Sequence, residues 1–181
     1  MDFKLANTFN RSSPAGAASW LVAWSSKNSE TRGISAALVS PEGKITTKFG
    51  ITTHDIPEAL AVGARDNVWL LAWEDSGYIW ASPVGQDGRV LDSTPSKLSS
   101  IREPLTSLTV LESPSGWKII WGGIDAQGNP STEFVEIDLE GNVIGRGVLI
   151  DGLAAYSVAV SGKDYFAVAV SGGGGDGDIL G

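Results

Sequence analysis

The chain has 181 residues, a formal net charge of −8, no cysteine and a single histidine. The lack of cysteine excludes a disulfide framework, a thiolate metal site and a cysteine nucleophile, and the acidic charge argues against nucleic acid as a partner. The apolar runs are too short to cross a bilayer, so we expect no membrane insertion. The 23 glycines and seven tryptophans indicate a turn-rich all-β protein.

One short motif recurs along the chain, an aromatic residue followed by apolar residues. Its copies end at residues 24, 73, 121 and 170, so the period is 48 or 49 residues. The copies are Trp20–Trp24, Trp69–Trp73, Trp117–Trp121 and Phe166–Val170. Self-similarity at a fixed period of this length is the signature of a tandem repeat fold.

Each repeat is predicted to contain four short strands. In the second repeat they are Ala59–Gly63, Val68–Trp73, Tyr78–Val84 and Val90–Ser93. The second strand is continuously apolar, as expected for a strand covered on both faces. In three repeats a glycine after the third strand is expected to supply the positive φ of a tight turn. These glycines are Gly43, Gly88 and Gly141.

Four antiparallel strands repeated in tandem are typical of β-propeller blades, whereas a β-sandwich gives no reason for the period. We expect one partial propeller domain over 1–181, with repeats at about 10–53, 54–99, 100–150 and 151–181, the last one truncated. Residues 2–9 are expected to form the fourth strand of a preceding or closing blade. About three and a half blades form an incomplete ring, so we expect a fragment of a larger propeller or a homodimer joined through open blade edges.

The repeats resemble a bacterial propeller-type tandem repeat of surface and secreted proteins. Blades of that family carry an aromatic-Leu-Val-x-Trp strand and an Asp-x-x-Gly-like turn. Here the turns that follow the three tryptophan motifs are Ser40–Gly43, Gln86–Gly88 and Asp138–Gly141. The resemblance implies a binding or surface role and an extracellular or cell-surface location, although Met1–Lys4 does not read as a signal peptide. It brings no catalytic motif.

The tryptophans divide into a repeated set and one exception. Residues four apart on a strand share a face, so we expect each motif pair to pack between blades. The pairs are Trp20 with Trp24, Trp69 with Trp73 and Trp117 with Trp121. Trp80 lies outside this pattern and is the candidate for an exposed ring that stacks on a sugar or a peptide.

Three carboxylates are candidates for ligand binding or, as a pair, for glycoside hydrolysis: Glu74, Asp75 and Asp125. The first repeat has serines where the second has Glu74 and Asp75, so a solvated acidic loop is the expected structure there. His54 is expected to be a solvated loop histidine, since no Gly-x-Ser-x-Gly motif accompanies it.

A glycine-rich stretch near the end of the sequence contains Asp176 and Asp178, which are weak candidates for binding calcium. The stretch lacks the regular aspartate spacing of a calcium loop and coincides with an expected turn. We therefore expect no metal and no cofactor.

These features favour a non-enzymatic β-propeller segment that binds a protein or a carbohydrate, or that is an architectural part of a long surface protein. The connection between the second and third strands varies between repeats, as binding loops on a constant scaffold do. The alternative is part of a glycoside hydrolase or lyase-type propeller enzyme, with carboxylates that converge on its channel.

Overall fold

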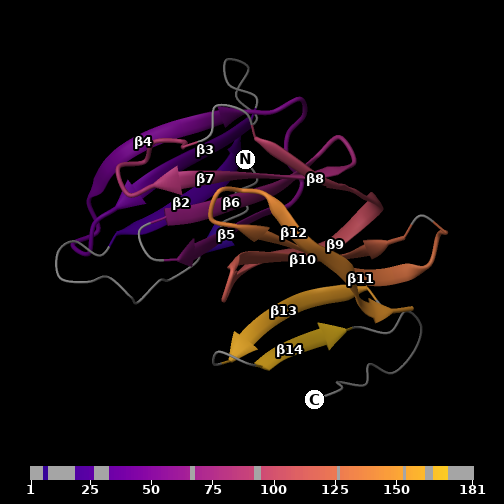
Figure 1. The fold of residues 1–181 in the computed structure, drawn as a ribbon. Coiled ribbons are helices and arrows are strands. Elements are labelled where there is room, and N and C mark those ends of the chain that lie inside the picture. Colours follow the sequence, from indigo (N-terminus) through magenta and orange to yellow (C-terminus); the bar gives the residue numbers. More distant parts are fainter. Residues whose placement is uncertain are drawn as a thin grey trace.

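A computed structural model of the chain describes residues 6–7, 19–26, 33–65, 68–91, 95–125, 127–152, 154–161 and 165–170 (Figure 1). Every helix or strand within these ranges is a β-strand, so the all-β class is confirmed. Accordingly, none of the described segments is an apolar helix of the length needed to span a membrane.

The described strands form four antiparallel sheets, each with its strands in chain order. The first sheet contains β1 (Ala6–Asn7), β2 (Trp20–Ser26), β3 (Gly33–Val39) and β4 (Ile45–Thr52). The second contains β5 (Leu60–Arg65), β6 (Val68–Asp75), β7 (Tyr78–Gly85) and β8 (Ser96–Ser100). The third contains β9 (Arg102–Ser113), β10 (Gly116–Ile124), β11 (Pro130–Asp138) and β12 (Val143–Asp151). The fourth pairs β13 (Ala155–Ser161) with β14 (Tyr165–Val170).

The turn after the third strand has the same form in the first three sheets. Its glycine adopts a positive φ, of 77° in Gly43, 80° in Gly88 and 88° in Gly141. The glycine N–H donates to the carbonyl oxygen three residues earlier, as in Gly88 to Gly85 at 2.9 Å. A side chain at this backbone geometry is strained, so the glycine of each repeat fixes where the chain reverses.

The fourth strand of the second sheet begins later than the sequence suggested. Of the expected strand Val90–Ser93, Val90 and Leu91 belong to no regular strand, and its last two residues lie outside the described residues. Val90 makes only an isolated bridge with Val84, and the Leu91 N–H donates to the Pro83 carbonyl oxygen at 2.9 Å. Regular pairing with β7 begins again at β8, directly after Pro95, which has no N–H to contribute to a ladder.

The strand at the start of the chain also differs from the expectation for residues 2–9. Ala6 lies opposite Ala23 and Asn7 opposite Val22, so β1 pairs with β2. β1 is thus the first strand of the first sheet, not the fourth strand of another blade. The continuously apolar β2 is paired on both edges in this way, as β6 and β10 are.

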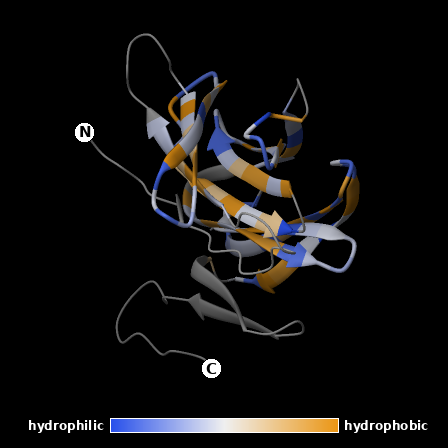
Figure 2. Cartoon of the chain, turned by 90° about the vertical axis from the view of Figure 1, so that its left-hand side faces the viewer, coloured by the Kyte–Doolittle hydropathy of each residue, from blue (hydrophilic) through white to orange (hydrophobic). Residues whose placement is uncertain are grey.

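Neighbouring sheets pack face to face in chain order. Side chains alternate along β6, so Trp69, Leu71 and Trp73 pack against the first sheet while Leu70 and Ala72 pack against the third. Figure 2 shows hydrophobic residues along the strands and hydrophilic residues at many of the turns. The interfaces between the first and second sheets and between the second and third sheets are therefore apolar layers.

The sheets approach each other at their first strands. β5 contacts β1 and β9, and β9 contacts β13, whereas the fourth strands β4, β8 and β12 make no comparable contact with one another in the described residues. Gly63 on β5 makes the close approach possible, because a Cβ there would overlap Cγ1 of Val110 on β9. The sheets thus fan outward from their first strands.

Replacing Gly63 with alanine is expected to destabilise the fold by about 1–3 kcal/mol, because the new methyl group must displace Val110. Urea unfolding followed by tryptophan fluorescence measures the change. Adding Val110→Ala should recover part of the loss. Gly145→Ala is the matched control, since a Cβ there would lie an ordinary 3.6 Å from the nearest atom, Cβ of Glu136. Equal costs at the two glycines would contradict the close approach of β5 and β9.

Arg65, at the end of β5, links the second and third sheets. Its Nη1 donates to the carbonyl oxygens of Ser113 and, at 3.1 Å, Gly116, and its Nη2 donates to that of Pro114 at 3.0 Å. The guanidinium therefore satisfies three carbonyl groups of the turn between β9 and β10.

Candidate functional site

The sheets have one regular end and one variable end. Connections at the variable end lead from the second to the third strand and from one sheet to the next. Only Ser76 and Gly77 join β6 to β7, whereas residues 125–129 join β10 to β11 and residues 53–59 join the first sheet to the second. The sequence-predicted residues His54, Glu74, Asp75 and Asp125 all belong to this end.

Asp75 is buried, with 3% of its surface exposed, so the expectation of a solvated acidic loop is wrong here. Its carboxylate accepts the backbone N–H groups of His54 at 2.7 Å and Asp55 at 2.9 Å, and the Ser76 hydroxyl at 2.9 Å. The first two donors lie on the connection from the first sheet. Asp75 therefore fastens this connection to the second sheet.

The environment of Asp75 favours its charged form. Burial alone would raise the pKa of the carboxyl, but the hydrogen bonds from His54, Ser76 and Asp55 outweigh burial and lower it. Nδ1 of the His54 ring also lies 3.3 Å from Oδ2 of Asp75. The imidazole is thus oriented by a buried carboxylate although 78% of this side chain is exposed.

Glu74 is equally buried, at 3% exposure, and again the solvated loop is not observed. Its Oε1 accepts the N–H of Gly77 at 3.0 Å. The turn it stabilises is unusually tight, with φ of 56° at Ser76 and 77° at Gly77. Two positive φ values in succession are typical of a two-residue hairpin turn that matches the twist of the strands. The carboxylates of Glu74 and Asp75 therefore support the β6–β7 hairpin.

Trp80 lies in a small cluster of aromatic and cationic side chains that we call the His54 patch: His54, Tyr78, Trp80 and Lys97. The ring centroids of Trp80 and His54 are 6.1 Å apart. Nζ of Lys97 lies 3.2 Å from the ring centroid of Tyr78 and 5.9 Å from that of Trp80. Trp80 is partly buried and its Nε1 donates to the Asp75 carbonyl oxygen at 3.2 Å, so it is not an open stacking platform by itself.

Asp125 shapes a turn. Its Oδ1 accepts the backbone N–H groups of Gln127 and Asn129 at 2.9 and 2.8 Å. The N–H of Asn129 contributes most to lowering the pKa of Asp125. Asp138 makes the same contacts in the β11–β12 turn, where Asn142 takes the place of Asn129. This shared Asp-x-x-Gly-Asn pattern assigns Asp125 a structural role that sequence reasoning missed.

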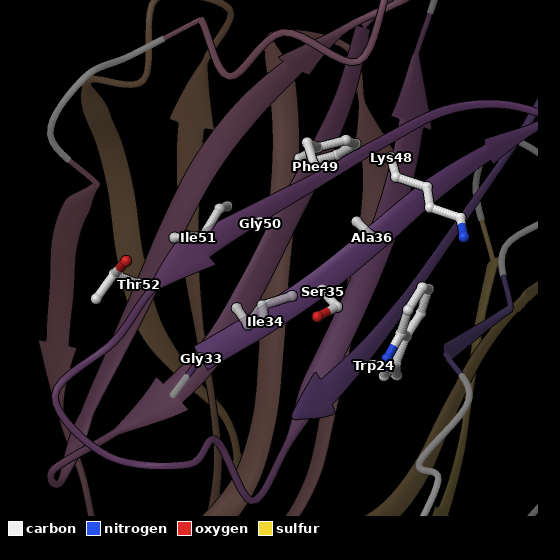
Figure 3. Close-up of a pocket in the computed structure, with 10 residues that line it drawn as sticks. All are labelled: Trp24, Gly33, Ile34, Ser35, Ala36, Lys48, Phe49, Gly50, Ile51 and Thr52. Atoms are coloured by element: carbon white, nitrogen blue, oxygen red, sulfur yellow. The ribbon is translucent and has the colours of Figure 1, made fainter. Parts of the chain in front are cut away.

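A hollow of about 430 Å³ lies on the first sheet, on the face turned away from the second sheet (Figure 3). Trp24, Ser35 and Lys48 extend on this side from β2, β3 and β4, and Gly50 leaves the surface beside them empty. We call this surface the Trp24 face. Nothing in the sequence singled it out, because a hollow depends on which residues stand opposite one another across strands.

The described residues contain no group of three or more histidine, aspartate or glutamate side chains placed to hold a metal ion. The weak calcium candidates Asp176 and Asp178 lie outside the described residues. The candidate surfaces are therefore the His54 patch and the Trp24 face.

No protein family model matches the chain, and a search of curated proteins found no match.

Proposed function

We propose that the chain is a non-enzymatic segment of a β-propeller and acts as a binding module, with the variable end as its ligand-binding surface. The repeat period, the four-stranded sheets stacked in chain order and the fan around the first strands support a propeller arrangement. Tandem blades of this kind present loops from neighbouring sheets at one end, where they form a composite surface.

The observation that carries the binding proposal is the His54 patch. It places aromatic rings and two side chains with N–H donors at the variable end, and His54 is largely exposed. Partly exposed aromatic rings beside an exposed imidazole and an exposed amino group, held by a rigid scaffold, suit a carbohydrate or a peptide. Glu74 and Asp75 support this assignment, because they hold backbone N–H groups of the neighbouring hairpin turn and connection in place. Asp125 does the same in the β10–β11 connection at the variable end.

A glycan array and a peptide array, probed with the purified chain, test the proposal. Any ligand found should bind at least ten-fold more weakly to a His54→Ala, Lys97→Ala double variant. Lys44→Ala, exposed at the regular end, is the matched control and should bind normally. A blank result on both arrays, or equal binding by the double variant, contradicts the proposal and favours an architectural role.

The second candidate, part of a glycoside hydrolase or lyase-type enzyme, is favoured by the His54–Asp75 pair. A histidine oriented by a buried carboxylate is a common arrangement for a general base. Release of reducing ends or of unsaturated sugars from polysaccharides, abolished by His54→Gln, would support this candidate. Absence of these products, or equal yields from the variant, would exclude His54 as its base.

A further inference from the structure

We propose that the Trp24 face docks the fourth sheet of a second copy of this chain, so that two copies associate through two equivalent contacts. The inference goes beyond the proposed function and rests on a surface that the first three sheets share. In each of these sheets, three residues lie opposite one another on the second, third and fourth strands. The first of them is the tryptophan that ends the repeated motif. These rows are Trp24–Ser35–Gly50, Trp73–Trp80–Lys97 and Trp121–Glu133–Val148.

The tryptophan that begins the row is buried wherever a preceding sheet covers it. Trp73 is 2% exposed in the core between the first and second sheets, and Trp121 is 4% exposed between the second and third. Trp24 occupies the same position in the first sheet but is partly exposed. No other sheet in the described part of the chain packs on it. Within the described residues, the Trp24 face is thus an intersheet surface that no other sheet covers.

The covering surface has a constant composition in the two interfaces that are complete. It consists of a Leu-x-Ala pair on the second strand and an Ile-x-Ala pair on the third. Trp73 is covered by the face of Leu21, Ala23, Ile34 and Ala36, and Trp121 by the face of Leu70, Ala72, Ile79 and Ala81. A partner for Trp24 should therefore be a β-sheet with small and branched aliphatic side chains in this arrangement.

A second copy offers such a sheet. The repeat aligns Ala167 and Ala169 of β14 with Leu21 and Ala23 of β2, so the sequence keeps the alanine of the Leu-x-Ala pair and has a smaller aliphatic residue in place of its leucine. One side of the fourth sheet lies on the third sheet through β9 and β10, and no described sheet lies on its other side. Because the stack fans around its first strands, two copies that meet in this way curve toward each other and can close, instead of growing into a filament.

The hollow beside Trp24 fits the same partner. In the second sheet the corresponding positions carry the larger residues Trp80 and Lys97, whereas Ser35 and Gly50 leave a hollow beside Trp24. A side chain of the docked sheet can occupy this space and complete the packing.

Light scattering from about 1 to 100 µM, where micromolar association is resolved, tests the docking. The wild type should reach twice the mass of one 18.9 kDa chain. Trp24→Glu should weaken association at least ten-fold. Ser35→Trp should do the same while folding normally, because it copies the Trp73–Trp80 row. Leu139→Glu is the control, since it removes another exposed apolar side chain, 48% exposed, and should leave the mass unchanged.

A wild type that stays monomeric over this range overturns the proposal, as does an oligomer that both Trp24→Glu and Ser35→Trp leave intact. Circular dichroism of the variants separates lost association from lost folding. The measurement needs no ligand, so a failure of the docking proposal does not affect the proposed binding function. Equally, a failure to find a ligand on the arrays does not affect the docking proposal.

Discussion

Trp73→Ala is expected to destabilise the protein by about 3–5 kcal/mol, the cost of removing a fully enclosed large aromatic side chain. Trp73 is 2% exposed and packs in the apolar layer between the first and second sheets. The substitution leaves a cavity there and removes contacts with both sheets. Urea unfolding followed by far-ultraviolet circular dichroism measures the effect without depending on tryptophan emission.

Two comparisons sharpen this prediction. The indole N–H of Trp73 is buried and has no hydrogen-bond partner among the residues that the structure describes, so Trp73→Phe keeps most of the packing and removes no hydrogen bond seen there. We expect it to cost less than half as much as Trp73→Ala. Trp24→Ala, at the equivalent but partly exposed position, should cost the monomer much less. Equal costs for Trp73→Ala and Trp24→Ala would contradict the difference in burial between the two faces.

Asp75→Ala is expected to destabilise the protein by about 3 kcal/mol, because it removes a buried, charged acceptor from three hydrogen-bond donors. The N–H groups of His54 and Asp55 and the hydroxyl of Ser76 would all lose their acceptor. The connection between the first two sheets should become more accessible, so hydrogen exchange at His54 and Asp55 should rise with the loss of stability. Unchanged exchange at these amides would contradict the fastening role of Asp75.

The same contacts predict a pH dependence. The pKa of Asp75 is lower in the folded protein than its ordinary value of 3.8, so its contribution to stability is present above that value. It is lost as the pH falls from there through the lower folded pKa. Asp75→Asn should therefore flatten the fall in unfolding free energy at acid pH. Asp55→Asn, whose exposed carboxyl accepts none of these bonds, is the control and should follow the wild type.

The all-β class, the second strand of each repeat and the turn glycines could be predicted because a few consecutive residues determine each of them. The apolar run from Trp69 to Trp73 specifies a strand covered on both faces, and Gly88 specifies a reversal. The structural roles of Glu74 and Asp75 could not be predicted in this way. Charged residues after a strand ordinarily face water, and only the partners of Asp75, 20 and 21 residues earlier in the chain, make its burial favourable.

The His54 patch illustrates the same limit. Lys97 lies near Tyr78 and Trp80 because the register of β7 against β8 shifts between Ile79 and Trp80. Such a shift in register moves a side chain along the neighbouring strand, and no short stretch of the sequence indicates where it occurs. Trp80 could be singled out as an exception to the repeat, but its neighbours could not be named.

The stacking of sheets in chain order also bears on how the protein folds. Each sheet is a run of consecutive strands and contacts chiefly the sheets next to it in sequence, so folding can start in one sheet and spread to its neighbours. The second sheet lies between two four-stranded sheets, whereas the third has a two-stranded sheet on one side among the described residues, and Arg65 ties the second sheet to the third. We expect its backbone amides to exchange most slowly with solvent, so that unfolding proceeds inward from the ends of the stack.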